Sequence, residues 1–251
     1  MSVPVSTVVP SVAASADVLI VHGLAEHKGR YAYVQRRLAD AGFRSHAIDL
    51  RGHGEADGFP GKVSDPDDWI DDVAEGVAIA SSGRPLFLIA HSMGTLPTLA
   101  WLGERGPGSV RAVVLSACPI APGKATLEAL ADPDAPGIPP SAVSRDPAVV
   151  KAYADDPLVF NENVPPECTA TAMLTAQRAF EGASSVSIPV LLIHGGDDPI
   201  ADPSGSQDMH DALASTDKTL IVYEGLYHEV FNEPERDQVL ADVIAWLNSH
   251  R

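Results

Sequence analysis

Residues 85–94 read PLFLIAHSMG, and this stretch decides how the chain is interpreted. Its first six residues form a short apolar run, which is typical of a strand buried on both faces of a parallel sheet. Ser92 follows, and a helical pattern begins at once. A nucleophilic serine is held on such a strand-to-helix turn by the pattern G-x-S-x-G. Here the pattern is Ala90-His91-Ser92-Met93-Gly94, so Ser92 is either a nucleophile or the cap of the next helix.

Strand and helix patterns alternate on both sides of this stretch. Continuous apolar runs predict strands over 18–22, 43–50, 85–90, 110–115, 189–194 and 219–223. Helical spacing of apolar residues predicts helices over about 31–41, 67–80, 93–104 and 234–248. This alternation predicts an α/β fold with a mostly parallel sheet and right-handed crossovers.

The alternation stops between residues 119 and 187. Prolines are frequent there, and only short helices over 148–154 and 167–180 are predicted. The stretch is too apolar for a linker. We therefore predict a core made of 1–118 and 188–251, with 119–187 as an insertion that sits on the sheet.

Two later strands are followed by the groups that an activated serine needs. Asp197 and Asp198 follow strand 189–194, and His228 follows strand 219–223. A serine hydroxyl needs a base, and that base needs an orienting carboxylate, in the chain order Ser, Asp, His. Among the nine histidines, His228 alone stands on the right loop in that order; His22 and His194 end strands, where packing is the common role.

Acyl transfer also needs donors for the developing oxyanion. The N–H of Met93, directly after Ser92, is one candidate. The N–H of Leu24, in the loop after the first strand, is the second, although His22-Gly23 is otherwise a simple turn. No His, Cys, Asp or Glu cluster has metal-ligand spacing, so we expect no metal and no cofactor.

Composition limits the partners. The 251 residues carry a formal net charge of −17, which argues against nucleic acid and anionic membrane surfaces as main partners. No apolar run is long enough to span a membrane, and residues 1–17 lack the positive region of a signal peptide. Two cysteines are no disulfide framework. These features predict a soluble, cytoplasmic protein, and they leave its oligomeric state open.

Several motifs together resemble the α/β-hydrolases, and more narrowly their monoacylglycerol lipase and lysophospholipase-like branch, the serine aminopeptidase S33-type hydrolases. The matching segments, spread from residue 22 to about 235, are HGLAEHKGRY at 22–31, DLRGHG at 49–54, HSMG at 91–94, DPLV at 156–159, GDDPIADP at 196–203 and YHE at 227–229. The chain departs from the family pattern at Ala90 and Thr95, and only a short segment precedes the first strong strand.

The resemblance implies roles for individual residues. Ser92 would be the nucleophile, Asp198 rather than Asp197 the acid, and His228 the base. Leu24 and Met93 would supply the oxyanion N–H groups. Glu26 and Arg30 match positions near the alcohol end of the pocket, or else form a salt bridge that shapes their loop. Asp202 would cap the following helix.

The resemblance also implies the reaction. We expect a carboxylic ester hydrolase that cleaves a monoacylglycerol into glycerol and fatty acid through an acyl-enzyme, with the insertion as a cap over the site. The cap would contact lipid surfaces transiently, without stable membrane insertion. The alternatives are a carboxylesterase for other short-chain or lysophospholipid esters, and a weakly catalytic ligand-binding protein with this fold.

Overall fold

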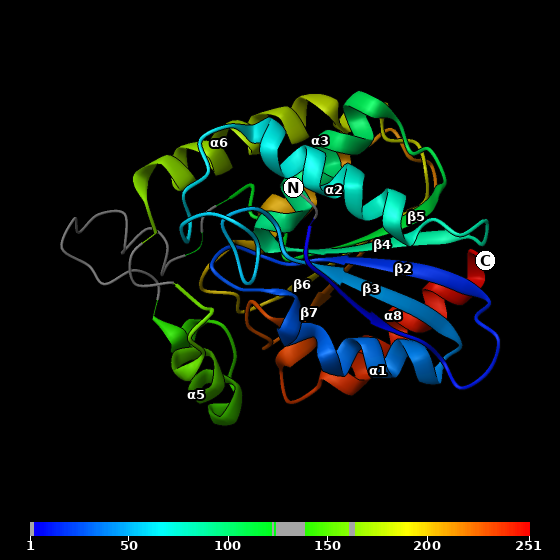
Figure 1. Ribbon diagram of the computed structural model, residues 1–251, viewed down its shortest axis with the longest axis horizontal. Coiled ribbons are helices and arrows are strands. Elements are labelled where there is room, and N and C mark those ends of the chain that lie inside the picture. Colours follow the sequence, from blue (N-terminus) through cyan, green and yellow to red (C-terminus); the bar gives the residue numbers. More distant parts are fainter. Residues whose placement is uncertain (1–2, 122, 124–138, 161–163) are drawn as a thin grey trace.

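A seven-stranded sheet, ordered β1-β3-β2-β4-β5-β6-β7, forms the centre of the protein (Figure 1). The computed structural model describes residues 3–121, 123, 139–160 and 164–251. All neighbouring strands pair in parallel except β1, which runs antiparallel to β3. The strands are β1 (Val5–Val8), β2 (Ala16–Val21), β3 (Phe43–Ile48), β4 (Leu86–His91), β5 (Val110–Ser116), β6 (Val190–Gly195) and β7 (Lys218–Tyr223).

Helices cover both faces of this sheet, so the predicted α/β fold with a mostly parallel sheet is confirmed. The α-helices of the described residues are α1 (Ala32–Asp40), α2 (Pro66–Ala80), α3 (Thr95–Arg105), α5 (Pro147–Asp155), α6 (Pro166–Gly182), α7 (Pro203–Ala212) and α8 (Arg236–Ser249). The helices α1 and α8 lie on one face, and α2, α3 and α6 lie on the other (Figure 1). None of the described helices is both long and apolar enough to cross a membrane.

The strand β4 shows why the sheet is buried on both faces. Leu86, Leu88 and Ala90 point into the core beneath α2 and α3. Phe87 and Ile89 point into the core shared with α1 and α8. Because side chains alternate along a strand, a continuous apolar run supplies both cores at once.

The first strand was not predicted from the sequence. Residues 5–8 mix Val with Ser and Thr and lie between Pro4 and Pro10, so they show no continuous apolar run. They form an edge strand that pairs with residues 45–48 of β3, where one side of the backbone needs no partner strand. Among the described residues that precede β2, one strand is present.

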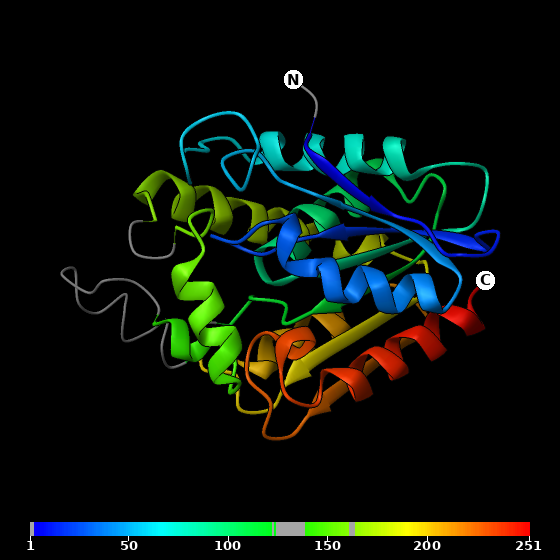
Figure 2. The ribbon, with the colours of Figure 1, turned by 60° about the horizontal axis from the view of Figure 1, so that its bottom comes forward.

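The insertion contacts the core in several places, two of which set the positions of α6 and α5. The helix α6 lies across α3 so closely that a Cβ on Gly103 would stand 2.7 Å from the Cα of Gly182. The segment before α5 is joined instead to the loop that precedes α8, as Figure 2 shows. There the Glu229 N–H donates to the Val143 carbonyl (2.9 Å), and the Arg145 N–H donates to Glu233 (2.6 Å).

Candidate active site

Ser92 lies on a tight turn between β4 and α3. Its φ of +48° is in the left-handed region, which costs a residue with a side chain about 1–3 kcal/mol unless its surroundings hold it there. The turn runs so close to the end of β2 that a Cβ on Gly94 would lie 2.2 Å from the His22 carbonyl oxygen. Only glycine fits at position 94, whereas Ala90 is accommodated within β4. The geometry is that of a nucleophile turn and not of an ordinary helix cap.

A continuous hydrogen-bonded chain joins Ser92, His228 and Asp198. The Ser92 Oγ lies 2.8 Å from His228 Nε2, and His228 Nδ1 lies 2.7 Å from Asp198 Oδ2. All three residues are buried and follow the carboxyl ends of β4, β6 and β7. Because a carboxylate only accepts, Nδ1 carries the hydrogen and Nε2 is free to accept the serine proton.

Neighbouring charges and hydrogen bonds shift the pKa values of Asp198 and His228. Burial by itself would raise the pKa of Asp198, but His228 and hydrogen bonds from His194 and His228 hold that pKa far below its usual value. Burial by itself would lower the pKa of His228, but the charge of Asp198 and its hydrogen bond raise it above 6.5. Asp198 therefore stays ionised, and His228 binds a proton more strongly than an isolated imidazole does.

The structure separates the two neighbouring aspartates. Asp198 is buried, and its Oδ1 accepts hydrogen bonds from the backbone N–H groups of Ile200 (2.8 Å) and Ala201 (3.0 Å). Asp197 is exposed. Asp202 accepts from the Ser204 N–H at 2.9 Å and precedes Pro203, so it caps α7 as expected.

The loop after β2 lies against the serine. A Cβ on Gly23 would stand 3.0 Å from the Ser92 Cβ, which places the next residue, Leu24, beside the nucleophile. Met93 follows Ser92 in the first turn (η2, Ser92–Gly94), where backbone N–H groups have no intrahelical partner. The oxyanion role of the Leu24 and Met93 N–H groups stays a prediction that this arrangement supports.

Glu26 and Arg30 form an ion pair, with Arg30 Nη1 2.9 Å from Glu26 Oε2. The salt bridge named as the alternative role is therefore present, while direct contact with substrate stays a prediction. Glu229 is a second carboxylate partner of Arg30: its two oxygens accept hydrogen bonds from Arg30 Nη1 (2.5 Å) and Nη2 (2.7 Å). The Tyr153 ring of α5 lies 4.6 Å from the guanidinium carbon. The sequence reasoning missed Glu229, although it directly follows His228.

His91 was also missed as a neighbour of the site. Its ring lies 4.9 Å from the His228 ring, and its Nδ1 lies 3.1 Å from the Ser116 Oγ. Burial and the charge of His228 lower the pKa of His91 to about 3. His91 therefore remains uncharged while His228 takes up a proton, and it adds no competing cation to the site.

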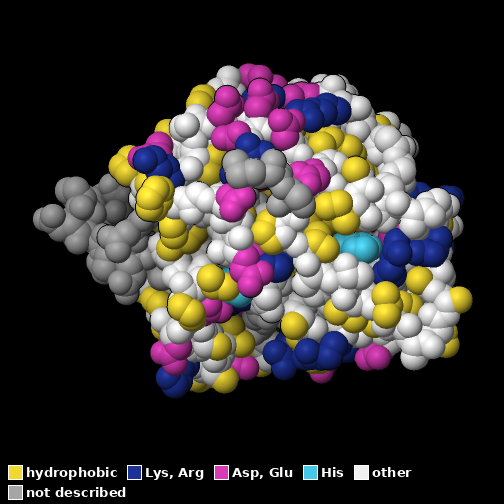
Figure 3. Space-filling view, in the orientation of Figure 1, with side chains coloured by type: hydrophobic (Ala, Val, Ile, Leu, Met, Phe, Trp, Pro, Cys, Tyr) yellow, Lys and Arg dark blue, Asp and Glu magenta, His cyan; other side chains and the backbone are white. Residues whose placement is uncertain are grey.

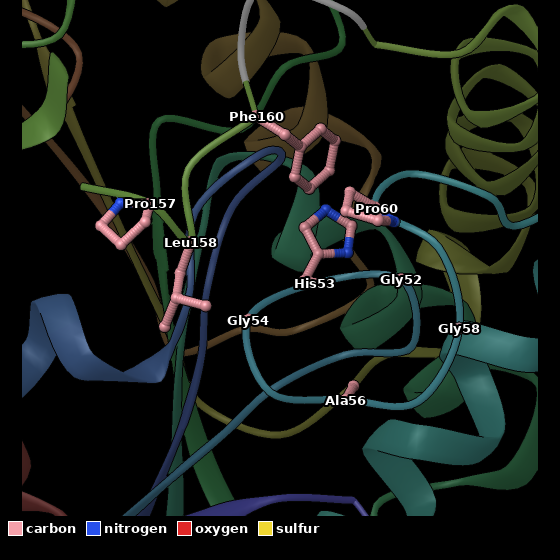
Figure 4. Close-up of a pocket in the computed structure, with 9 residues that line it drawn as sticks. All are labelled: Gly52, His53, Gly54, Ala56, Gly58, Pro60, Pro157, Leu158 and Phe160. Atoms are coloured by element: carbon pink, nitrogen blue, oxygen red, sulfur yellow. The ribbon is translucent and has the colours of Figure 1, made fainter. Parts of the chain in front are cut away.

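A small cavity of about 70 Å³ lies between the loop 52–60 and the insertion. Figure 4 shows His53 in its wall with Phe160 above it; the two rings are 5.0 Å apart. Among the described residues, those that line the cavity include no nucleophile and no carboxylate. Burial lowers the pKa of His53 to about 3, so this ring stays neutral. We assign the chemistry to the Ser92 chain and not to this cavity.

Metal chemistry finds no support in the described part of the chain, which contains no group of three His, Cys, Asp or Glu side chains able to hold an ion. The absence of a metal and of a cofactor stays a prediction.

A mostly parallel sheet with a serine turn and a Ser–His–Asp chain at its strand ends defines the α/β-hydrolase class. The family described as serine aminopeptidase, S33, matches residues 13–235, and the chain belongs to this family. Membership of this hydrolase family, together with the similarity to the lipases described next, makes the chain a carboxylic ester hydrolase.

Similar proteins agree with this assignment. The chain is 38% identical to a monoacylglycerol lipase of Mycolicibacterium smegmatis, over 93% of this chain and 88% of that protein. It is 31% identical to the mouse monoglyceride lipase, over 96% of this chain and 85% of that protein. The crystal structure of a Paleococcus ferrophilus monoacylglycerol lipase superposes with a TM-score of 0.86, with 30% identity and full coverage of both chains.

Proposed function

We propose that this protein hydrolyses monoacylglycerol into glycerol and fatty acid through an acyl-enzyme. The observation that carries the proposal is the buried chain Ser92–His228–Asp198, with hydrogen bonds of 2.8 and 2.7 Å. The similarity to monoacylglycerol lipases over nearly the whole chain supports the choice of substrate.

The first half of the reaction forms the acyl-enzyme. The Ser92 Oγ attacks the ester carbonyl while His228 Nε2 takes its proton, and Asp198 stabilises the imidazolium that results. The N–H groups of Leu24 and Met93 would hold the oxyanion, where one such donor is typically worth about 3 kcal/mol. The tetrahedral intermediate then collapses, and His228 donates its proton to the departing glycerol oxygen.

The second half releases the fatty acid. His228 Nε2 takes a proton from a water molecule, which attacks the acyl carbonyl. Collapse of this second intermediate breaks the bond to Ser92, and His228 returns the proton to Oγ. The serine is thus regenerated, and one water is consumed for each ester cleaved.

Charge favours a neutral substrate. Two buried carboxylates, Glu26 and Glu229, share the single guanidinium of Arg30 next to His228. The formal net charge of the chain is −17, and acidic side chains gather on the face over α2 (Figure 3). A negative site on a negative protein repels anionic head groups, so a monoacylglycerol suits it better than an anionic lysophospholipid.

We also propose that the insertion 119–187 caps the active site; residues 122, 124–138 and 161–163 of it lie outside the described residues. Two anchors support this. One is the attachment of Val143 and Arg145 to the loop that carries His228. The other joins the insertion to the loop of Leu24, where His27 Nε2 lies 2.9 Å from Asp156 and the Phe160 N–H donates to the Ala25 carbonyl.

The same insertion would make transient contact with lipid surfaces. Met173 and Leu174, both on α6, are 69% and 52% exposed, so apolar side chains are available for this contact. We further place the protein in the cytoplasm, because Cys118 and Cys168 are both free thiols, as is usual in reducing compartments.

Fatty-acid release from a panel of esters tests the substrate. The panel holds monoacylglycerols of short, medium and long chain, a diacylglycerol, a lysophosphatidylcholine and a short synthetic ester. Wild type should prefer a monoacylglycerol, Ser92→Ala should be inactive, and Ser249→Ala, an exposed serine of α8, should match wild type. Turnover confined to the synthetic ester would overturn the substrate and leave a general carboxylesterase.

Labelling with a fluorophosphonate tests the nucleophile independently of any substrate. Wild type and Ser249→Ala should label, and Ser92→Ala should not. A wild type that does not label would refute the activated serine and favour the weakly catalytic, ligand-binding alternative.

A further inference from the structure

His194, at the end of β6, contacts the same oxygen of Asp198 that His228 contacts. Its Nε2 lies 3.0 Å from Asp198 Oδ2 and 3.0 Å from the Ala201 carbonyl oxygen. Its Nδ1 lies 2.6 Å from the Ser206 Oγ, and the ring is fully buried. This histidine was expected only to pack at a strand end, and the reaction described above does not use it.

The partners of the ring fix where its hydrogen sits. A backbone carbonyl and a carboxylate are both acceptors, so the nitrogen facing them, Nε2, must carry the hydrogen. Nδ1 is then the acceptor, and the Ser206 hydroxyl donates to it. Both ring nitrogens are thus satisfied inside the protein, which leaves His194 one tautomer and one orientation.

The two oxygens of Asp198 are held by different means. Oδ1 accepts from the backbone N–H groups of Ile200 and Ala201. Among the described residues, the hydrogen bonds of Oδ2 come from two imidazoles, His194 and His228. Without His194, His228 would be the one hydrogen-bond donor left to Oδ2 among the described residues, and the bonds to Oδ1 would have to orient the carboxylate by themselves.

We infer that His194 is a positioning residue of the reaction: its Nε2–H, fixed by Ser206, aims Oδ2 of Asp198 at His228. The inference rests on the proposed function, since it needs Ser92 and His228 to act as nucleophile and base. His194 on β6 contacts the acid Asp198 directly, and Ser206 on α7 holds His194.

Substitution of His194 tests this role. In His194→Leu the donor is lost, and a displacement of the order of 1 Å in such a group lowers kcat by about 10²-fold. KM should stay unchanged because His194 does not reach substrate. The acid limb of the pH profile should move to lower pH, because a carboxylate that swings away stabilises the His228 cation less. The other groups that act on His228, namely Glu26, Glu229 and His91, are unaltered.

Conservative variants separate positioning from folding. His194→Gln places an amide N–H close to the position of Nε2 and should recover most of kcat. Ser206→Ala keeps the ring and its Nε2–H but removes the hydrogen bond to Nδ1 that holds the ring in place, so kcat should fall several-fold in a folded protein. His46→Leu, which removes a buried histidine from β3, should reduce stability without moving the acid limb.

The fluorophosphonate labelling rate gives a readout that does not depend on the ester chosen. It should fall in His194→Leu and recover in His194→Gln, while nitrogen-15 NMR of labelled histidines should show His194 protonated at Nε2. An unchanged rate with a labelled Ser92 would overturn the role of His194 and leave the proposed function intact. A fall in kcat with the acid limb unmoved would reduce His194 to a structural residue. If the wild type itself is not labelled, both the proposed function and the role of His194 are refuted.

Discussion

Arg30 holds both carboxylate oxygens of Glu229, the residue that directly follows the base His228. The two bonds measure 2.5 and 2.7 Å, and both side chains are buried. Arg30 also bonds Glu26 in the loop after β2. One guanidinium therefore ties the loop that carries the base to the loop that carries the Leu24 N–H, two segments about 200 residues apart in the sequence.

Replacing Arg30 with Met should destabilise the protein, because Glu26 and Glu229 would be left buried and unpaired. Removal of one partner from a buried ion pair costs about 3–5 kcal/mol. Since the Arg30 Nη atoms are already engaged by the two carboxylates, kcat/KM should fall equally for a monoacylglycerol and for the methyl ester of the same acid. Urea unfolding and parallel assays of the two esters measure these effects.

Lys151→Met is the matched control, because the Lys151–Asp155 pair of α5 is exposed. Such pairs contribute only about 0.3–0.5 kcal/mol. If Arg30→Met loses activity on the glycerol ester alone, Arg30 contacts the alcohol part of the substrate and the loop-shaping role is insufficient.

Replacing Asp198 with Asn should abolish most activity without unfolding the protein. The amide can present its N–H to His228 Nδ1, which stabilises the wrong tautomer and lowers kcat by about 10⁴-fold. The same change at exposed Asp197 should leave kcat within a factor of two of wild type. Comparable losses at both positions would show that the acid has been assigned to the wrong aspartate.

Local patterns predicted most of the fold and the chemical groups. Side chains of β2, β4 and β6 pack into two hydrophobic cores, one on each face of the sheet, so these strands are continuous apolar runs. Such runs can be recognised from the sequence alone. Chain order after three strands was enough to select Ser92, His228 and the pair Asp197–Asp198, because parallel strands bring their carboxyl ends to one edge. The family resemblance then selected Asp198 within that pair.

Contacts between distant segments could not be predicted in this way. Glu229 is important because it contacts Arg30, and His194 because it contacts Asp198 and Ser206. The local spacing of residues in the sequence does not predict these contacts. Strand β1 was missed for a similar reason: an edge strand with Pro at both flanks is defined by its partner β3.

Replacing Asp202 with Ala should affect stability and not catalysis. Its side chain accepts the Ser204 N–H at the start of α7, and losing such a cap costs about 1 kcal/mol. In a chain of this size that lowers Tm by about 2–4 °C. Calorimetry and steady-state kinetics check both parts; a raised KM with an unchanged Tm would contradict the capping role.

The pH dependence of kcat/KM should report the environment of His228. This base must be neutral to take the Ser92 proton, so activity is lost as the pH falls through its pKa. Burial alone would lower that pKa, but Asp198, Glu229 and Glu26 raise it, so the acid limb should have its midpoint above pH 6.5. Glu229→Gln removes one of these charges and should move the midpoint to lower pH. Glu224→Gln, an exposed change on the same loop, should leave it in place. If Glu229→Gln leaves the midpoint of the acid limb unchanged, Arg30 screens the charge of Glu229 from His228. Glu229 then acts only through its ion pair with Arg30.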